Sequence, residues 1–181
     1  MAVAKDILAT YSPEDVVVIL HNTKFSHQIS GYTEGSFLEV ERIIPHAALT
    51  NGADGTNARV VRAVKNCDIS LTLMQTSESN DILSQLLVLD EGSRDGSDVF
   101  AITIKDNTGR TVMSSAAAFI GTVPNVSFSQ EVSDRPWIIH AIHMVEHIGG
   151  NGRFTPDSST TASELGLEFE DRWRPLATLT P

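Results

Sequence analysis

The residues best suited to chemistry are three histidines close together, His140, His143 and His147, with Glu146 beside them. On a helix, His143 and His147 would share one face, as a pair of zinc ligands does. The segment opens with Pro136-Trp137-Ile138-Ile139, however, which is typical of an extended strand. In a strand, His140 points away from the other two histidines. With no cysteine or acidic cluster to complete a site, we interpret them as ordinary strand or surface histidines.

Other reactive groups are equally isolated. Cys67 is the only cysteine, so no intramolecular disulfide is possible, and we expect a buried thiol in a reducing compartment. The acidic residues Glu91, Asp95 and Asp98 lack the ligand spacing of an EF-hand and indicate a solvated loop. There is no Gly-x-Ser-x-Gly elbow, phosphate loop or His-Glu-x-x-His motif. The sequence therefore predicts no catalytic, cofactor-binding or metal-binding residues, and favours a binding or structural role.

The charge balance constrains the partners. The chain has 181 residues, enough for one sizeable core, and 13 basic against 23 acidic side chains give a net charge of −10. Holding nucleic acid needs clustered Lys and Arg, which this balance argues against. A negative surface instead repels phosphates within a Debye length of about 8 Å. No stretch approaches the roughly 20 apolar residues of a membrane span, and Met1–Tyr11 lacks a signal-peptide pattern, so we expect a soluble protein made in a cytoplasm.

Strand signals dominate the elements that would position these residues. Val16–Leu20 is a continuous apolar run, and Phe37–Ile44 alternates Leu38 and Val40 with Glu39 and Glu41. Further extended candidates are Ile69–Leu73, Phe100–Lys105, Thr111–Ile120 and Trp137–Ile148. Asp106–Gly109 predicts a hairpin turn in which Gly109 is free to take positive φ.

One helix is expected over Glu78–Glu91, where leucines and Ile82 form an apolar stripe, with Ser77 or Ser79 as cap and Gly92 as stop. Pro45–Asn57 is interpreted as the tip of a long hairpin joining Phe37–Ile44 to Ala58–Lys65. The predicted fold is mainly β: an antiparallel β-sandwich or barrel with one flanking α-helix and a long protruding β-hairpin.

The end of the chain differs in composition. Thr155–Ser163 is rich in Ser, Thr, Pro and Asp, as a loop or linker would be, and Leu165–Trp173 carries apolar residues. We expect a barrel domain over residues 1–152 and a C-terminal extension over residues 153–181 that packs on the barrel or on a neighbouring subunit.

Several stretches, in this order and spacing, resemble the tail-tube (phage structural protein) family of contractile-tailed bacteriophages. They are Thr10–Val18, Ile29–Tyr32, Gly35–Arg42, Gly52–Gly55 with Arg59 and Arg62 downstream, Ile69–Ser77 leading into Ser79–Leu83, Phe119–Gly121, Phe128–Ser129 and Trp137. The resemblance spans roughly residues 10 to 148 and contains no catalytic signature.

The resemblance implies a non-enzymatic subunit of a tail tube, located in the virion tail and assembled in the bacterial host cytoplasm. Six copies would close a ring by joining sheet edges, and the rings would stack into a tube through which DNA passes without specific binding. The implied partners are further copies of the chain and the sheath, baseplate or initiator, tape-measure and tail-terminator proteins, with no cofactor and no membrane insertion.

The resemblance and the charge together suggest roles for particular residues. The strand pair Phe37–Ile44 and Ala58–Gln75 is the candidate lumen-lining sheet. Glu39 and Glu41 would then face the lumen, where six copies form two acidic bands that keep phosphates off the wall. The hairpin would reach the next ring, with Asp54 and Gly55 at its tip and Arg59 and Arg62 pairing with carboxylates of the neighbour.

Three alternatives stay open. The inner tube of a contractile bacteriocin or of a secretion-like machine would share this architecture but carry no genome. A small β-fold enzyme would need a nucleophile and a base in one cleft, which no motif offers. A secreted β-sandwich adhesion module would stay monomeric, whereas a tube subunit should polymerise.

Overall fold

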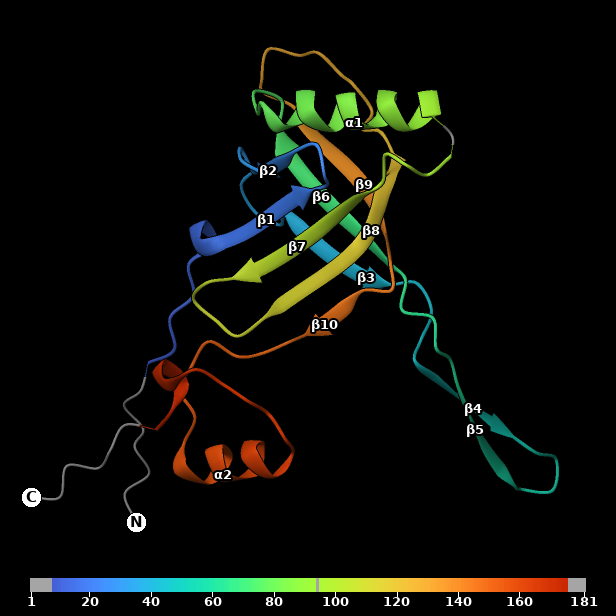
Figure 1. The fold of residues 1–181 in the computed structure, drawn as a ribbon, viewed down its shortest axis with the longest axis vertical. Coiled ribbons are helices and arrows are strands. Elements are labelled where there is room, and N and C mark those ends of the chain that lie inside the picture. Colours follow the sequence, from blue (N-terminus) through green and yellow to red (C-terminus); the bar gives the residue numbers. More distant parts are fainter. Residues whose placement is uncertain (1–7, 94, 176–181) are drawn as a thin grey trace, which may run out of the picture.

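The computed structural model describes residues 8–93 and 95–175, and its centre is one antiparallel sheet of eight strands (Figure 1). The strand order is β2-β1-β7-β8-β9-β6-β3, with β10 paired to the start of β8, and a separate two-stranded sheet joins β4 to β5. The strands of the large sheet are β1 (Val16–His21), β2 (Ser26–Gln28), β3 (Leu38–Arg42), β6 (Cys67–Met74), β7 (Phe100–Asp106), β8 (Val112–Thr122), β9 (Asp134–Ile142) and β10 (Val145–His147). The predicted mainly β fold is confirmed.

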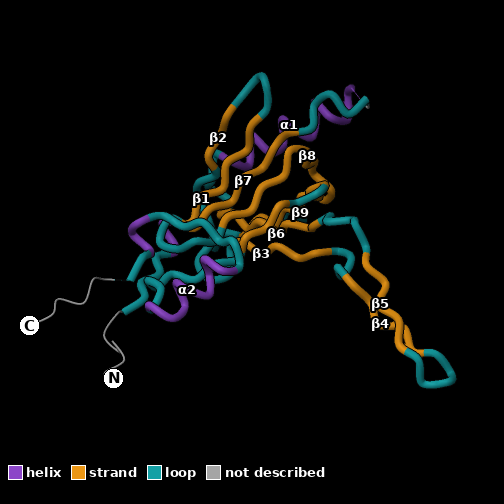
Figure 2. The backbone as a smooth tube through the Cα atoms, turned by 60° about the horizontal axis from the view of Figure 1, so that its bottom comes forward, coloured by secondary structure: helices purple, strands orange, loops and turns teal. Residues whose placement is uncertain are grey.

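The core lies inside a bend of this sheet. The sheet curves so that β1, β7 and β8 lie over β9, β6 and β3 (Figures 1 and 2). Alternate residues of both halves belong to one buried cluster, as Leu20, Ile102, Ile69, Leu71 and Ile139 show. Because side chains of a strand alternate between faces, the intervening residues form an outer face that points away from this core.

The sheet does not close into a barrel among the described residues, although its two edges approach each other at one corner. The chain after β2 crosses from one edge of the sheet toward the other. Ile29 N donates to Val18 O of β1, and Met74 N donates to Gly31 O, both at 2.9 Å. The fold is therefore an open, strongly bent sheet with two exposed edges, β2 and β3.

The predicted helix is confirmed as α1 (Ser79–Ser93), which lies across one end of the bent sheet (Figure 1). Its buried residues Leu83 and Leu86 join the core. The Ser79 hydroxyl accepts a hydrogen bond from Ser30 N at 3.0 Å, which fixes the start of the helix to the chain after β2. Gly92 does not stop the helix as expected, because the last turn runs to Ser93.

The predicted protruding hairpin is present, but the expected pairing of Phe37–Ile44 with Ala58–Lys65 is wrong, because β3 pairs with β6. Much of the expected loop Pro45–Asn57 is strand: β4 (Ala47–Asn51) pairs with β5 (Asn57–Val61), and only residues 52–56 form the turn. We call β4, β5 and this turn the arm. Figure 2 shows the arm projecting away from the rest of the molecule, and every arm residue except Ala47 is exposed.

The expectation of a loop over Thr155–Ser163 is wrong, because α2 (Pro156–Glu164) forms there. Thr155 caps this helix by accepting from Ser158 N at 3.3 Å, Pro156 occupies the first turn and Asp157 suits the helix dipole. A short 3₁₀ turn, η2 (Asp171–Trp173), follows. The start signal was present in the sequence, but the Ser- and Thr-rich composition obscured it.

The turn predicted at Asp106–Gly109 is present, with Gly109 N donating to Asp106 O at 3.3 Å. The expected positive φ at Gly109 is wrong, since the positive-φ glycines are Gly31, Gly35, Gly55, Gly96 and Gly166. Gly109 is needed for space instead. A Cβ atom there would lie 2.6 Å from the Asp106 carboxylate and 2.8 Å from the Asn151 amide nitrogen.

Candidate assembly surfaces

The structure separates the histidines that suggested a metal site. His140 lies on β9 with Nδ1 2.6 Å from Asp68 Oδ1, while His143 occupies the following turn at φ 50°. Glu146 is engaged elsewhere, as described next. Across residues 8–93 and 95–175, no three His, Cys, Asp or Glu side chains gather closely enough to hold a metal ion.

Cys67 sits in a structural cluster at the start of β6. Its thiol donates to Glu146 Oε1 at 2.9 Å, and Arg42 donates to Glu146 Oε2 at 2.7 Å. Burial, then the hydrogen bond and charge of Glu146, raise the pKa of the Cys67 thiol to about 12. A thiol held protonated is a poor nucleophile. The bonds of Glu146 to Cys67 and Arg42 fasten β3, β6 and β10 together.

A row of side chains crosses the outer face of the sheet over four strands. The strand register places Glu41 opposite Asp68, Asp68 opposite His140 and His140 opposite Phe119. The imidazole of His140 contacts Asp68 on one side and lies 5.4 Å from the Phe119 ring centroid on the other. The row has an acidic end at the β3 edge and an aromatic end on β8.

Glu39 and Glu41 share this outer face, as their alternation with Leu38 and Val40 predicted. Both are exposed, whereas Leu38 and Val40 pack against the core cluster. The neighbours on β6 are polar too: Asp68, Ser70 and Thr72. Asp68 was missed as a member of this surface, although its alternation with Ile69 gave the same parity signal. No helix among the described residues covers this half of the face in Figure 1, so it is an acidic, polar wall.

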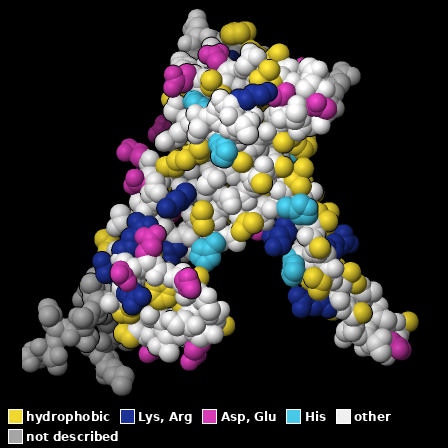
Figure 3. Space-filling view, viewed as in Figure 1, with side chains coloured by type: hydrophobic (Ala, Val, Ile, Leu, Met, Phe, Trp, Pro, Cys, Tyr) yellow, Lys and Arg dark blue, Asp and Glu magenta, His cyan; other side chains and the backbone are white. Residues whose placement is uncertain are grey.

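The arm presents a different surface. Cross-strand partners share a face, and the register pairs Leu49 with Arg59 and Ala47 with Val61. Leu49, Arg59 and Val61 therefore lie on one face, with Leu49 71% and Val61 55% exposed. Figure 3 shows hydrophobic side chains along the arm and Lys and Arg side chains gathered near its base. An exposed apolar face on a two-stranded hairpin is stable only when something packs on it.

The predicted contact residues of the hairpin divide between its tip and its base. Asp54 and Gly55 are at the tip, where Gly55 has φ 84° and the hydrogen bonds of Thr56 to the Asp54 carboxylate lower the pKa of that carboxyl. Arg62 follows β5 at the base, and its N–H donates to His46 O at 2.8 Å. Neither Arg59 nor Arg62 forms an ion pair with another side chain of residues 8–93 and 95–175. The structure does not bring the arm together with Glu39 and Glu41.

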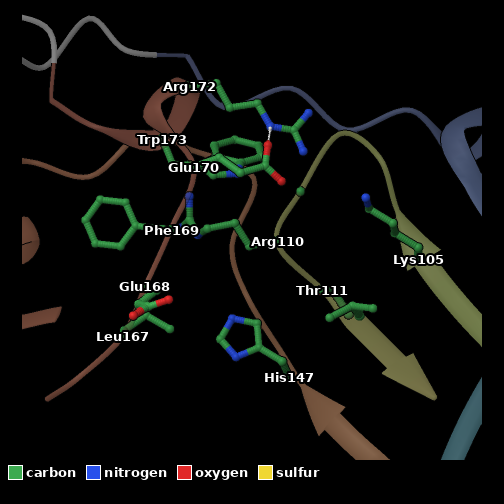
Figure 4. Close-up of a pocket in the computed structure, with 12 residues that line it drawn as sticks. Lys105, Arg110, Thr111, His147, Leu167, Glu168, Phe169, Glu170, Arg172 and Trp173 are labelled. Carbon is green, nitrogen blue, oxygen red and sulfur yellow. Dashed lines mark ion pairs between the residues drawn. The ribbon is translucent and has the colours of Figure 1, made fainter. Parts of the chain in front are cut away.

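A pocket of about 370 Å³ lies where the C-terminal segment packs against the β7–β8 hairpin (Figure 4). Arg110 is its centre: the guanidinium lies 4.3 Å from the Phe154 ring centroid and 4.9 Å from that of Trp173, and Nη1 donates to Gly152 O. Burial lowers the pKa of Arg110. Through these contacts Arg110 holds the C-terminal segment against the β7–β8 hairpin.

No helix within residues 8–93 and 95–175 is long and apolar enough to cross a membrane.

The chain is 33% identical over 167 residues to structural protein ORF10 of Pseudomonas phage KPP10, covering 91% of this chain and 96% of that protein. The chain belongs to this family of phage structural proteins. That relationship agrees with the expected non-enzymatic role. No family model matches the chain.

Solved structures show the fold in another setting. The tube-terminating cap of the anti-feeding prophage aligns with 81% of this chain and 99% of its own, at a TM-score of 0.50 and 14% identity. At that identity the likeness shows a shared fold. The sheath/tube terminator of an extracellular contractile injection system aligns over 77% of this chain and 97% of its own at 12% identity, with a TM-score of 0.46, too low for a structural argument.

Proposed function

We propose that the chain is a structural subunit of a phage tail tube, in which copies form hexameric rings that stack. The observation that supports this most directly is the arm. It extends a basic and apolar face into solvent, where nothing among the described residues packs against it. A hairpin of this kind is ordered by a neighbouring copy, and membership in a family of phage structural proteins makes a tail assembly its natural setting.

The open sheet supports ring formation. Its two edges, β2 and β3, carry backbone N–H and C=O groups that pair with another strand where one is available. Joining such edges around a rotation axis closes a ring, and closure removes the edges from solvent. Six copies around the axis follow the resemblance of the sequence to tail-tube proteins.

We place the acidic outer face of β3 and β6 on the lumen. Glu39, Glu41 and Asp68 then form acidic bands around the channel. DNA that slides through is repelled by this wall, because like charges within a Debye length keep the phosphates from adsorbing. A tube with this lining conducts DNA during ejection without binding it specifically.

The remaining partners follow from a tube with two ends and an outer wall. An initiator or baseplate would start the stack and a terminator would stop it. A tape-measure protein would set its length, and a sheath would surround it. The C-terminal segment around α2, held on the β7–β8 hairpin by Arg110, lies on the surface and is available to the sheath or to a neighbouring subunit.

A tube-terminating cap is the second candidate, favoured by the fold shared with the cap of the anti-feeding prophage. Negative-stain electron microscopy of the purified protein over a series of concentrations and salts separates the two functions. Tubes that lengthen with concentration support the tube subunit. Single rings that never stack indicate the terminator. A monomer under every condition contradicts both and favours a soluble binding module.

The inner tube of a bacteriocin-like particle shares this architecture, and kinship with a phage structural protein argues for a genome-carrying particle. Nuclease-protected DNA in purified particles that contain this chain tests that distinction. Particles without DNA would contradict the proposed role in DNA passage while leaving the tube itself intact.

A further inference from the structure

We propose that the Leu49–Arg59–Val61 face of the arm docks on the α1 end of the next copy, with Leu49 entering the apolar pocket beside α1 and Arg59 pairing with Asp81. This inference rests on the proposed stacking and names the surface that receives the arm.

The arm and α1 lie at opposite ends of the molecule. In Figure 1 the longest axis is vertical, with α1 across the top and β4 and β5 at the bottom. Two surfaces at opposite ends cannot meet within one chain, but they meet when copies are placed head to tail. A head-to-tail contact without closure produces an open filament, which is the geometry that stacking requires.

The receiving surface is an apolar pocket between α1 and the turn that joins β1 to β2. It has a volume of about 330 Å³, and its apolar lining comes from Phe25, Ile82, Leu86 and Leu89. Leu89 is 40% exposed because it borders a pocket that no described residue fills. The pocket is therefore suited to an apolar side chain from outside, and Leu49 at 71% exposure is a side chain of that kind.

Charge also favours contact between the arm of one copy and α1 of the next. All charged residues of α1 are acidic: Asp81, Asp90 and Glu91. Gln85 and Leu89 line the pocket, and Asp81 lies one turn before Gln85 on the same stripe of the helix. On the arm, Arg59 is directly opposite Leu49. A leucine with an adjacent arginine thus faces a pocket with an adjacent aspartate.

The one lysine at the pocket does not oppose this arrangement. The Lys24 ammonium lies 2.8 Å from Asp98 Oδ1, and the Asp98 side chain is 9% exposed. This pair is neutral as a unit, so Lys24 does not cancel the acidic charge of α1. The charge of Arg59 is therefore complementary to the acidic charges of α1, and two α1 ends would repel each other.

The direct test is a disulfide between copies. In tubes of the Leu49→Cys, Leu89→Cys double variant, mild oxidation should link each copy to the next and give a ladder of multimers on a non-reducing gel. The matched control is Leu49→Cys with Leu165→Cys, which places the second thiol on the exposed residue after α2, away from α1 (Figure 1). Native Cys67 is fully buried and should not contribute.

The outcomes separate the docking from the function. A ladder with Leu89→Cys and none with Leu165→Cys supports the proposal. Tubes that assemble but give no ladder, or give one only with Leu165→Cys, overturn the docking and leave the tube subunit standing. A wild-type protein that forms neither rings nor tubes overturns both.

A charge exchange tests the Arg59–Asp81 pair independently of cysteine chemistry. Arg59→Glu should raise the concentration needed for tube growth by about tenfold, because it sets like charges against each other. Adding Asp81→Arg should restore growth, whereas adding Asp157→Arg on α2, a matched change at the other end, should not. Equal recovery with either second substitution would contradict a specific pair.

Discussion

Gly121 on β8 leaves the space that the imidazole of His140 occupies on the outer face of the sheet. A Cβ atom at position 121 would overlap the Nε2 and Cδ2 atoms of that ring. The ring has little freedom to move, because Asp68 holds its Nδ1 and Phe119 packs beside it. Gly121→Ala should therefore destabilise the fold by about 1–3 kcal/mol, the usual range for overpacking, as measured by urea unfolding.

The double-mutant cycle with His140→Ala supplies the control. Once the imidazole is gone, Gly121→Ala should cost much less, since the three atoms nearest to the added methyl group all belong to that ring. An equal loss of unfolding free energy in both backgrounds would show that the methyl group clashes with something other than His140.

Cys67 should resist thiol reagents in the folded protein. Its pKa is raised to about 12, first by burial and then by Glu146, from an ordinary value near 9.0. Because the folded pKa is the higher one, the stability that this protonated thiol contributes is present below pH 9 and is lost as pH rises toward 12. At pH 8, maleimide should label native protein far more slowly than urea-unfolded protein. Similar rates would mean that the buried cluster with Glu146 opens readily.

Among the elements, the arm should be dispensable for folding and required for assembly. It contributes no residue to the buried core, and its base is already closed by the bond from Arg62 N to His46 O. Replacing residues 47–61 by Asn-Gly, a turn suited to a two-residue hairpin, should change the unfolding free energy by less than about 1 kcal/mol. Electron microscopy should then show no tubes.

A control for the excision keeps the arm and changes only its contact face. Leu49→Ser with Val61→Ser should leave the hairpin and the core intact and still reduce tube growth. If the excised protein forms tubes as readily as the wild type, the arm has no part in stacking.

The elements show what periodicity predicts well. Strands β1, β6, β7 and β8 and helix α1 were expected near their observed bounds, because each has one face buried in the core and its pattern follows from that burial. The single strand expected over Trp137–Ile148 is wrong, since the turn at His143 divides it into β9 and β10. The arm strand β4 has no buried face, so no alternation marked it and a loop was expected there, whereas β5 falls almost entirely within the expected strand Ala58–Lys65. Helix α2 buries only Ala162, and its polar composition concealed the Thr155-Pro156 start.

The candidate surfaces, too, were predictable only where a local sequence pattern determined them. Parity placed Glu39 and Glu41 correctly on one exposed face, because alternation alone decides which residues of a strand share a face. The row of Glu41, Asp68 and His140 depends on the register between strands far apart in the chain, which no local pattern contains. The pocket beside α1 likewise arises from the packing of α1 on the β1–β2 turn.

At the scale of the whole molecule, the single bent sheet gives the chain two walls with different chemistry. The side chains of the inner face are buried in the core, so the outer face of β3 and β6 is the surface that can face a lumen or a neighbour. The arm and α1 mark the two ends of the same body (Figure 1). Such a subunit has distinct contacts along and around a tube axis, and the position of Glu39 relative to that axis is open to measurement.

The lumen assignment predicts size-selective labelling of Glu39→Cys in assembled tubes. A small maleimide should diffuse along the channel and label most copies. A maleimide carried on a long poly(ethylene glycol) chain should label only those near the tube ends. Before assembly both reagents should react, because position 39 is exposed in the single chain. Equal labelling of tubes by both reagents would place Glu39 on the outer wall, and labelling by neither would bury it between subunits. Either result would remove the acidic bands from the DNA channel.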